Sequence, residues 1–262
     1  MTPPMTSPEP TGRLALVTGA SRGIGRAIAE RLAADGLRVI ASARSLASVE
    51  EVVASLAGSG HQALAMDLGD PASLGAGLAS LAALGRVDVL VNNAGIAESA
   101  PYDRTDDAAW DRMMQVNARA PMQLCRALVP AMVEAGWGRV VTVASNAGLT
   151  GYAYSSAYCA SKHAVIGYQR ALALEVARAG VTVNAVCPGW VETEMAERAV
   201  TNIASKTGRT YEDAKKALER MSPQGRMTRP DEVAALVAML ASDDAANIHG
   251  QALAIDGGQV MQ

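Results

Sequence analysis

The stretch LALVTGASRGIGRAIAERLAADG, residues 14–36, decides most of the fold. Residues 14–18 form a short apolar run, a glycine-rich turn follows at 19–25, and a helical pattern continues to about Ala34, with Gly36 as its stop. A strand-to-helix turn exposes free backbone N–H groups at the positive end of the helix dipole, and glycines let a phosphate approach the backbone closely. The stretch therefore predicts a nucleotide-binding βαβ unit, with a tight turn that binds nothing as the alternative.

The rest of the chain repeats this alternation of strand and helix. Further strands are expected at 37–42, 62–67, 86–95, 139–145, 181–189 and 251–258. Further helices are expected at 47–56, from Pro71 onward, within 106–134 with a kink or division at Pro121, at 156–179 and at 231–242. The strands are apolar without clean alternation, which is typical of parallel sheets. We predict an α/β fold of the Rossmann type, a doubly wound parallel sheet of about seven strands with helices on both faces.

Two segments stand apart from the alternation. Residues 1–12 are rich in proline and lack the charged and apolar regions of a signal peptide, so we expect a disordered tail. Residues 195–229 are polar, contain methionine and are partly helical. We expect a mobile substrate cap at about 190–225, with a small second domain as the alternative. Residues 13–262 would then form a single dinucleotide-binding catalytic domain.

Composition argues against several classes of function. The chain has 262 residues, is 50% hydrophobic and carries a formal net charge of −3, so it has no electrostatic footprint for nucleic acid or an anionic membrane. No apolar run approaches the roughly 18 residues that span a bilayer. The 3 cysteines and 3 histidines are dispersed, so we expect neither a disulfide framework nor a metal site. A reducing, cytoplasmic location agrees best with this pattern.

The end of the second strand bears on the choice of cofactor. Enzymes that bind NAD often place an Asp or Glu there to hold the ribose 2′-hydroxyl. Residues 41–44 are instead Ala-Ser-Ala-Arg, and Arg44 can pair a 2′-phosphate bidentately. Arg22, inside the glycine turn, can reach the same phosphate. Two cations at these places favour NADPH over NADH, although both could be ordinary surface charges.

A tyrosine and a lysine lie four residues apart in the helix expected at 156–179. Tyr158 and Lys162 therefore share one helix face. A tyrosine with its ordinary pKa near 10 is a poor acid or base at neutral pH, and a nearby ammonium stabilises the phenolate and lowers that pKa. Ser145, at the end of the fifth strand, could bind a substrate carbonyl. Asn117 could hold a water molecule behind the lysine. The pair alone would be weak evidence, because a surface pair with this spacing is common.

These features together resemble the short-chain dehydrogenase/reductase family. The resemblance rests on TGASRGIG (18–25), NNAG (92–95), Asn117, Ser145, YCASK (158–162) and PGWVET (188–193), and it covers about residues 13–258. Residues 157–193 look most like reductases of 3-oxoacyl thioesters and aromatic polyketides, and they are also similar to 3-hydroxybutyrate dehydrogenases.

The resemblance implies a role for each motif residue. Tyr158 would be the general acid in reduction and the base in oxidation, Ser145 would polarise the carbonyl, and Asn117 would complete a proton relay with Lys162. NADPH would supply the hydride. The implied cofactor-binding residues are Gly19, Ser21, Arg22, Gly23, Ile24, Gly25, Arg44, Asp67, Leu68, Asn93, Ala94, Gly95, Tyr158, Lys162, Pro188, Gly189, Val191 and Thr193.

The substrate end is less well determined. By resemblance, the loop after Ser145 and the cap line the cleft, where Tyr152, Tyr154, Trp190 and Met195 suggest an apolar pocket, although such residues are also ordinary core. Reductases of carrier-linked substrates usually carry basic residues beside the cleft. Leu174 and residues 134–137 occupy some of those places here, which makes a carrier-protein partner doubtful. Arg119, Arg126 and Arg170 remain candidates for such contacts.

The leading hypothesis is therefore NADPH-dependent reduction of a ketone, namely a small or CoA-linked 3-oxo compound or a free ketone. One alternative is an NAD-linked secondary alcohol or 3-hydroxyacid dehydrogenase. Another, from a different class, is a non-catalytic nucleotide-sensing protein, because fold alone does not determine function. The family resemblance also implies a homotetramer.

Overall fold

A computed structural model describes residues 12–261 of the chain. Most of the expected proline-rich tail, residues 1–11, lies outside the described residues. The strands are β1 (Leu14–Thr18), β2 (Arg38–Ala43), β3 (Gln62–Ala65), β4 (Val89–Asn92), β5 (Gly138–Val143), β6 (Val181–Pro188) and β7 (Ala252–Ile255). The α-helices are α1 (Gly23–Ala34), α2 (Leu46–Ser55), α3 (Pro71–Leu84), α4 (Asp107–Met114), α5 (Ala120–Glu134), α6 (Ser156–Val176), α7 (Glu194–Thr207), α8 (Tyr211–Glu219) and α9 (Pro230–Ala241).

The seven strands form one parallel sheet in the order β3-β2-β1-β4-β5-β6-β7. This confirms the predicted fold. β1 lies between β2 and β4, so successive connections run in opposite directions from β1. In doubly wound folds, the loops that leave the carboxyl ends of the strands separate at such a switch point and open a crevice for a ligand.

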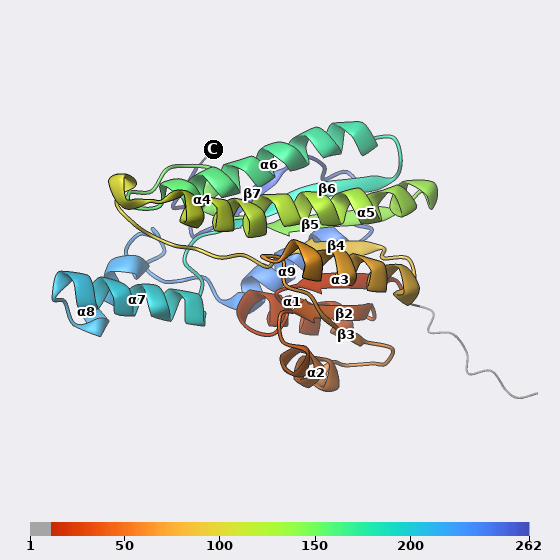
Figure 1. Ribbon diagram of the computed structural model, residues 1–262, viewed down its shortest axis with the longest axis horizontal. Helices are drawn as coiled ribbons and strands as arrows, with labels where there is room; N and C mark the ends of the chain where they lie inside the picture. Colours follow the sequence, from red (N-terminus) through yellow and green to blue (C-terminus); the bar gives the residue numbers. More distant parts are fainter. Residues whose placement is uncertain (1–11, 262) are drawn as a thin grey trace, which may run out of the picture.

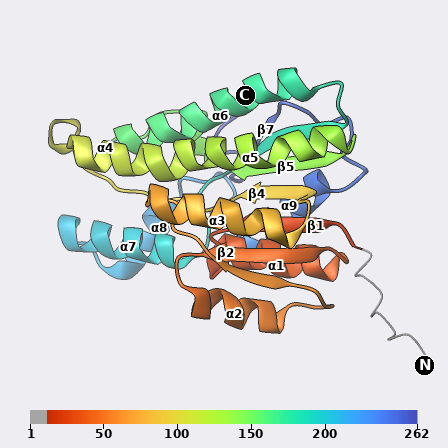
Figure 2. The same cartoon turned by 45° about the vertical axis from the view of Figure 1, so that its right-hand side comes forward.

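Helices cover both faces of the sheet, as Figures 1 and 2 show. On one face, α1, α2 and α9 pack on the strands through residues such as Ile28, Val49 and Val237. On the other, α3, α5 and α6 contribute residues such as Leu74 and Leu124. Burial of both strand faces explains why the strands read as continuous apolar runs in the sequence.

The helical region at 106–134 is divided where Pro121 predicts a break. α4 ends at Met114, the five residues Gln115–Arg119 form a π-helical segment, and α5 begins at Ala120. Proline lacks an N–H group, and in the first turn of α5 no intrahelical partner for that group is needed. The division places Asn117 inside the π-helical segment.

Beyond β6 the chain forms the helix pair α7 and α8, which stands at the left end of the molecule in Figure 1. The pair encloses a small apolar cluster of its own, formed by Ala196, Val200, Ala214, Leu218 and Met227. It occupies the segment expected to cap a site. No helix in the described part of the chain is long and apolar enough to cross a membrane.

Candidate active site

The glycine turn joins β1 to α1 and lies against the end of β2. The Ala20 N–H donates to the Ser42 carbonyl at 2.9 Å. Gly19 has a φ of +65°, and a Cβ at Gly25 would collide with the Gly19 carbonyl, so both positions require glycine. The Arg22 side chain makes no capping hydrogen bond, and the first turn of α1 has no acidic residue. Ser21, Gly23 and Ile24 complete the turn and are partly exposed. The first turn of α1 can therefore receive an anion.

Asn93 ties this turn to the end of β4. Its amide group donates to the carbonyls of Thr18 (2.8 Å) and Gly19 (3.3 Å). The Thr18 hydroxyl accepts from the backbone N–H groups of Asn93 and Ala94 at 3.0 and 3.1 Å. The Asn93 side chain, expected from the resemblance to line the cofactor, is thus engaged in holding the two loops of the switch point together.

The two arginines expected at a 2′-phosphate differ in their surroundings. Arg44 is exposed just after β2 and has no ion pair or hydrogen bond with any residue in the range 12–261. Arg22 is exposed too, but its guanidinium pairs with Glu194 of α7 at 2.7 Å. Arg44 is thus an unpaired cation at the predicted place, whereas Arg22 would exchange Glu194 for an anionic ligand.

Asp67 and Leu68 follow β3, at the same edge of the sheet. One carboxylate oxygen of Asp67 accepts from the Gly69 N–H at 2.9 Å, which shapes the turn. Leu68 is buried, and its carbonyl accepts from the Gln115 side chain at 3.0 Å. The second Asp67 oxygen has no partner in the described chain, so it could accept from the amino group of an adenine ring.

Ser145, Tyr158 and Lys162 meet at the carboxyl end of β5. The Ser145 hydroxyl caps a short 3-10 turn by accepting from the Ala147 N–H at 3.1 Å, and it lies close enough to the Tyr158 hydroxyl to lower the pKa of that phenol. The Lys162 ammonium lies 5.7 Å from the centre of the Tyr158 ring and donates to the Val143 carbonyl at 3.2 Å. The structure therefore brings together three of the four predicted catalytic side chains.

The expected lowering of the Tyr158 pKa by Lys162 is wrong for this arrangement. Burial raises the pKa of Tyr158, and the nearby Ser145 hydroxyl opposes that rise only in part. Burial also lowers the pKa of Lys162 to about 8. The Lys162 ammonium donates to the Val143 carbonyl and not to Tyr158. Burial of the Tyr158 phenol therefore outweighs the stabilisation of its phenolate by Ser145.

Asn117, the fourth predicted catalytic residue, lies near this group in the π-helical segment but does not bond to it directly. Its amide N–H atoms donate to the Ile96 carbonyl (2.9 Å) and the Ser161 hydroxyl (3.0 Å), and its oxygen accepts from the Ile96 N–H at 2.9 Å. A Cβ at Gly95 would lie 3.3 Å from that oxygen and 3.4 Å from the Lys162 nitrogen. Asn117 and Lys162 thus flank Gly95. Since both amide protons of Asn117 are used, a water molecule could bind only to its oxygen.

The residues expected at the nicotinamide end leave β6 in an extended turn. Pro188 is the last residue of β6, and the Gly189 N–H donates to the Ile255 carbonyl at 3.2 Å. Val191 pairs with Thr228 in an isolated bridge, and the Thr193 methyl group lies against Gly23 of the glycine turn. The turn after β6 thus reaches back to the first turn of α1.

The four predicted substrate residues have different surroundings. Tyr154 is exposed, adopts a positive φ of 64°, and lines a cavity of about 170 Å³ between the loop after Ala100 and the start of α6. Met195 is exposed at the start of α7. Trp190 packs on the apolar cluster of α7 and α8, so it belongs largely to that small core. Tyr152 is partly buried, and its hydroxyl is hydrogen-bonded to Gln259 at 2.9 Å.

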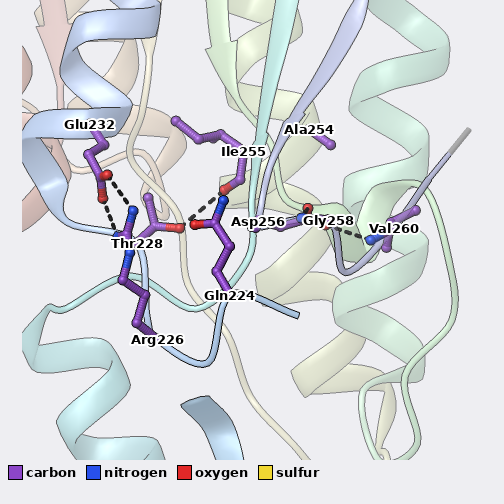
Figure 3. A pocket seen from close by; sticks show the side chains of 10 residues that line it. Gln224, Arg226, Thr228, Glu232, Ala254, Ile255, Asp256, Gly258 and Val260 are labelled. Atoms are coloured by element: carbon purple, nitrogen blue, oxygen red, sulfur yellow. Dashed lines mark hydrogen bonds and ion pairs between the residues drawn. The ribbon is translucent and has the colours of Figure 1, made fainter. Parts of the chain in front are cut away.

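A larger cavity, of about 360 Å³, lies behind the C-terminal turn (Figure 3). It is lined by Gln224, Arg226, Thr228, Glu232, Ala254, Ile255, Asp256, Gly257, Gly258 and Val260. None of the predicted site residues is among them. Its one cation, Arg226, is bound by both oxygens of Glu232 at 2.7 Å, so the cavity offers no free charge to a ligand.

The sequence patterns missed the C-terminal turn as a neighbour of the site. Asp256 and Gln259 contact Asn146, which follows Ser145 directly in the chain, although more than 100 residues separate them. No local signal could have found these contacts. No group of three or more His, Cys, Asp or Glu residues that could hold a metal ion occurs within residues 12–261.

The fold and the site together define a nicotinamide-dependent oxidoreductase of the Rossmann type. The family model described as short chain dehydrogenase matches residues 13–204, and the chain belongs to that family. It is 39% identical over 251 residues to the 3-oxoacyl-(acyl-carrier-protein) reductase of Escherichia coli, covering 95% of this chain and 98% of that protein.

Two further proteins extend the comparison. A D-beta-hydroxybutyrate dehydrogenase of Cupriavidus necator is 37% identical over 258 residues, which cover 96% of this chain and 99% of the relative. A solved structure of a variant actinorhodin polyketide ketoreductase with NADPH superposes with a TM-score of 0.90 at 38% identity, over 95% of this chain and 97% of that one. The similarity to short-chain reductases of 3-oxoacyl and polyketide substrates, inferred from the motifs, is thus confirmed.

Proposed function

We propose that this chain reduces a ketone, either a 3-oxoacyl thioester or a related carbonyl compound, to the secondary alcohol, with NADPH as the reductant and Tyr158 as the proton donor. The main support is that Ser145, Tyr158 and the buried Lys162 lie together at the carboxyl end of β5. The relatives named as 3-oxoacyl reductase and polyketide ketoreductase agree with this reaction.

The described residues fit a dinucleotide. The glycine turn and the first turn of α1 would hold the pyrophosphate, Arg44 would hold the 2′-phosphate, and Asp67 with Leu68 would meet the adenine. Ala94, Gly95, Pro188, Gly189, Val191 and Thr193 would border the nicotinamide end. When bound, the nicotinamide supplies the hydride. An unpaired arginine after β2, with no carboxylate there, favours NADPH over NADH.

The proton would come from this chain's own side chains. The raised pKa of Tyr158 keeps its proton on the phenol at neutral pH, and Ser145 holds that hydroxyl where it can meet a carbonyl oxygen. After the transfer, Lys162 would donate a proton to the Tyr158 phenolate, and a water molecule bound to the Asn117 oxygen would pass a replacement proton to Lys162. A phenol that stays protonated suits an acid in reduction better than a base in oxidation.

For the substrate, we prefer a CoA-linked or free 3-oxo compound over a carrier-linked one. Leu174 is 82% exposed where a basic residue would meet an acidic carrier. Arg119, Arg126 and Arg170 are exposed and could still contribute to such a contact. The residues at about 190–225, which include α7 and α8, would act as the substrate cap. A homotetramer and a cytoplasmic location remain predictions.

The test is NADPH oxidation with a panel of carbonyl compounds, comprising acetoacetyl-CoA, cyclic ketones, 1,2-diketones and aryl ketones. Replacement of Tyr158 by Phe removes only the transferable proton, so we expect turnover to fall by roughly 10²- to 10⁴-fold while NADPH still binds. A Tyr158→Phe variant that kept most of its activity would contradict the mechanism.

The same assay separates the alternatives. The similarity to the Cupriavidus D-beta-hydroxybutyrate dehydrogenase suggests an NAD-linked dehydrogenase as one alternative. Such an enzyme would show a higher kcat/KM with NADH than with NADPH and would oxidise 3-hydroxy acids. A nucleotide-sensing protein would bind NADPH and oxidise none of it across the whole panel.

A further inference from the structure

A series of hydrogen bonds joins the C-terminal turn to the loop that follows Ser145. It begins at Asp256, which is 4% exposed just after β7. The Asp256 carboxylate accepts from the backbone N–H groups of Gly258 (3.0 Å), Gln259 (3.1 Å) and Val260 (2.9 Å), as Figure 3 shows in part. It also accepts from the Asn146 side chain at 3.2 Å. The turn is thus a defined structure built around a buried acceptor.

The chemistry of Asp256 determines the direction of every later hydrogen bond. A carboxylate that accepts from several N–H groups requires Asn146 to present its NH₂ group. That NH₂ also donates to the Gln259 oxygen at 3.2 Å. Gln259 must then present its own NH₂ to the next partner, and it donates to the Tyr152 hydroxyl at 2.9 Å. The Tyr152 oxygen therefore acts as an acceptor, and its proton is left to donate elsewhere.

Tyr152 lies in the loop that connects two catalytic residues. Ser145 begins this loop, and Tyr158 lies in the first turn of the helix that ends it. Tyr152 is partly buried. Cys159, the residue after Tyr158, is close enough to Tyr152 to influence its pKa. Burial and Asp256 both raise the pKa of Tyr152, so its hydroxyl stays protonated. In residues 12–261, no acceptor is bound to that proton.

We propose that Tyr152 is a further substrate-binding residue whose hydroxyl donates to a second oxygen of the substrate, the thioester carbonyl of a 3-oxoacyl thioester, and that Gln259 is the positioning residue that orients it. The inference rests on the proposed function, because it assumes that the ketone is reduced at Ser145 and Tyr158. The inference favours substrates with two carbonyl groups, such as 3-oxoacyl thioesters, because a simple ketone has no second carbonyl oxygen to accept the Tyr152 proton.

The sharpest variant is Gln259→Glu, which keeps the size of the side chain and reverses its polarity. The new carboxylate can still accept from Asn146, but it would also accept the Tyr152 proton and so remove it from the substrate. Tyr152→Phe removes the same proton directly. For each, we would measure the Kd of acetoacetyl-CoA by titration calorimetry with the NADP⁺-loaded enzyme, and the ratio of kcat/KM for acetoacetyl-CoA to that for cyclohexanone.

We expect both variants to weaken acetoacetyl-CoA binding by about 5- to 30-fold and to lower the kcat/KM ratio by a similar factor, as loss of one hydrogen bond predicts. The double variant should be no worse than Tyr152→Phe alone, because both changes act on one proton. The matched control is Gln251→Glu, an exposed glutamine near β7, which should keep the ratio. Thermal melting of each variant would identify loss of folding.

Three outcomes would overturn the inference: an unchanged Kd and ratio in Tyr152→Phe, a further loss when Gln259→Glu is added to it, or a wild-type enzyme that does not bind acetoacetyl-CoA. Failure of the proposed function looks different. The enzyme would then bind acetoacetyl-CoA in a Tyr152-dependent way and yet oxidise no NADPH, which would leave the assignment of Tyr152 intact.

Discussion

At the scale of single residues, burial of the charged Lys162 side chain should lower the free energy of unfolding of the protein. Lys162 is 4% exposed, and burial lowers its pKa from 10.5 to about 8. Below pH 8 the lysine is charged in the folded and the unfolded chain, and the folded protein bears the full cost of the buried charge. Between pH 8 and 10.5 the unfolded chain binds more protons, so stability rises with pH across that window.

Lys162→Met should therefore raise the melting temperature of the cofactor-free protein at pH 7 by several degrees, since the cost of the charge is on the order of 3 kcal/mol. The gain should shrink as the pH approaches 10.5. Circular dichroism melts over this pH range would measure it. Lys206→Met, at an exposed lysine of α7, is the control and should show no such trend.

Arg44 should determine cofactor preference. It is exposed and unpaired within the described residues, so its removal breaks no internal contact. We expect Arg44→Ala to weaken NADPH binding by about 10- to 100-fold, as loss of a charge-assisted contact predicts, and to leave NADH binding nearly unchanged. Fluorescence titration of both cofactors would measure the two Kd values. Arg31→Ala, at an exposed arginine paired with Asp35, is the control. An equal loss for NADPH and NADH would contradict the assignment.

Local sequence patterns account for much at this scale. The spacing of Tyr158 and Lys162 and the position of Ser145 after a strand predicted that they meet once they were combined with the glycine turn and the other family motifs. The pKa of Tyr158 was not predictable, because it depends on how far the folded chain removes the phenol from water. The hydrogen bond between Tyr152 and Gln259 was hidden for the same reason, since it spans 107 residues.

At the scale of elements, the glycine turn depends on Asn93 as much as on its own glycines. In Asn93→Leu, the carbonyls of Thr18 and Gly19 would lose their donor. An unsatisfied buried group costs about 1–3 kcal/mol, so we expect a lower melting temperature together with weaker NADPH binding. Melting curves and cofactor titration would show both effects. Asn247→Leu, at an exposed asparagine, should change neither. Normal cofactor binding in Asn93→Leu would show that the glycines suffice to shape the turn.

Element boundaries were mostly predictable within a few residues, because apolar runs and Gly or Pro signals mark where strands and helices end. The expected strand at 86–95 is shorter in the structure, at Val89–Asn92, since Asn93 turns its side chain toward β1. Apart from Pro121, nothing in the sequence predicted the π-helical segment Gln115–Arg119. The wider turn of a π-helix depends on the residues that pack against it.

At the scale of the whole molecule, the parallel sheet was predictable because both its faces are buried, which leaves continuous apolar strands. The arrangement of α7 and α8 was less so. They enclose their own cluster, and they meet the glycine turn through the exposed pair of Arg22 and Glu194 and through the Thr193 methyl group beside Gly23. An exposed ion pair contributes about 0–1 kcal/mol to stability. The loss of the Arg22–Glu194 pair on ligand binding to Arg22 would therefore cost little, and α7 and α8 could then move.

The exposed face of α6 bears on how copies of the chain assemble. Leu174 is 82% exposed there, and a large apolar side chain in water is a common mark of an interface. If the predicted homotetramer uses this face, Leu174→Glu would place a charge in an apolar contact and should shift the assembly to dimers or monomers, as measured by light scattering at low concentration. Leu46→Glu is the control, because Leu46 is 46% exposed at the start of α2, on the other face of the sheet. Unchanged mass for Leu174→Glu would exclude this face from the interface, whereas loss of mass in both variants would point to general destabilisation. A selective loss would also explain why a hydrophobic residue stands where a carrier-binding reductase would need a basic one.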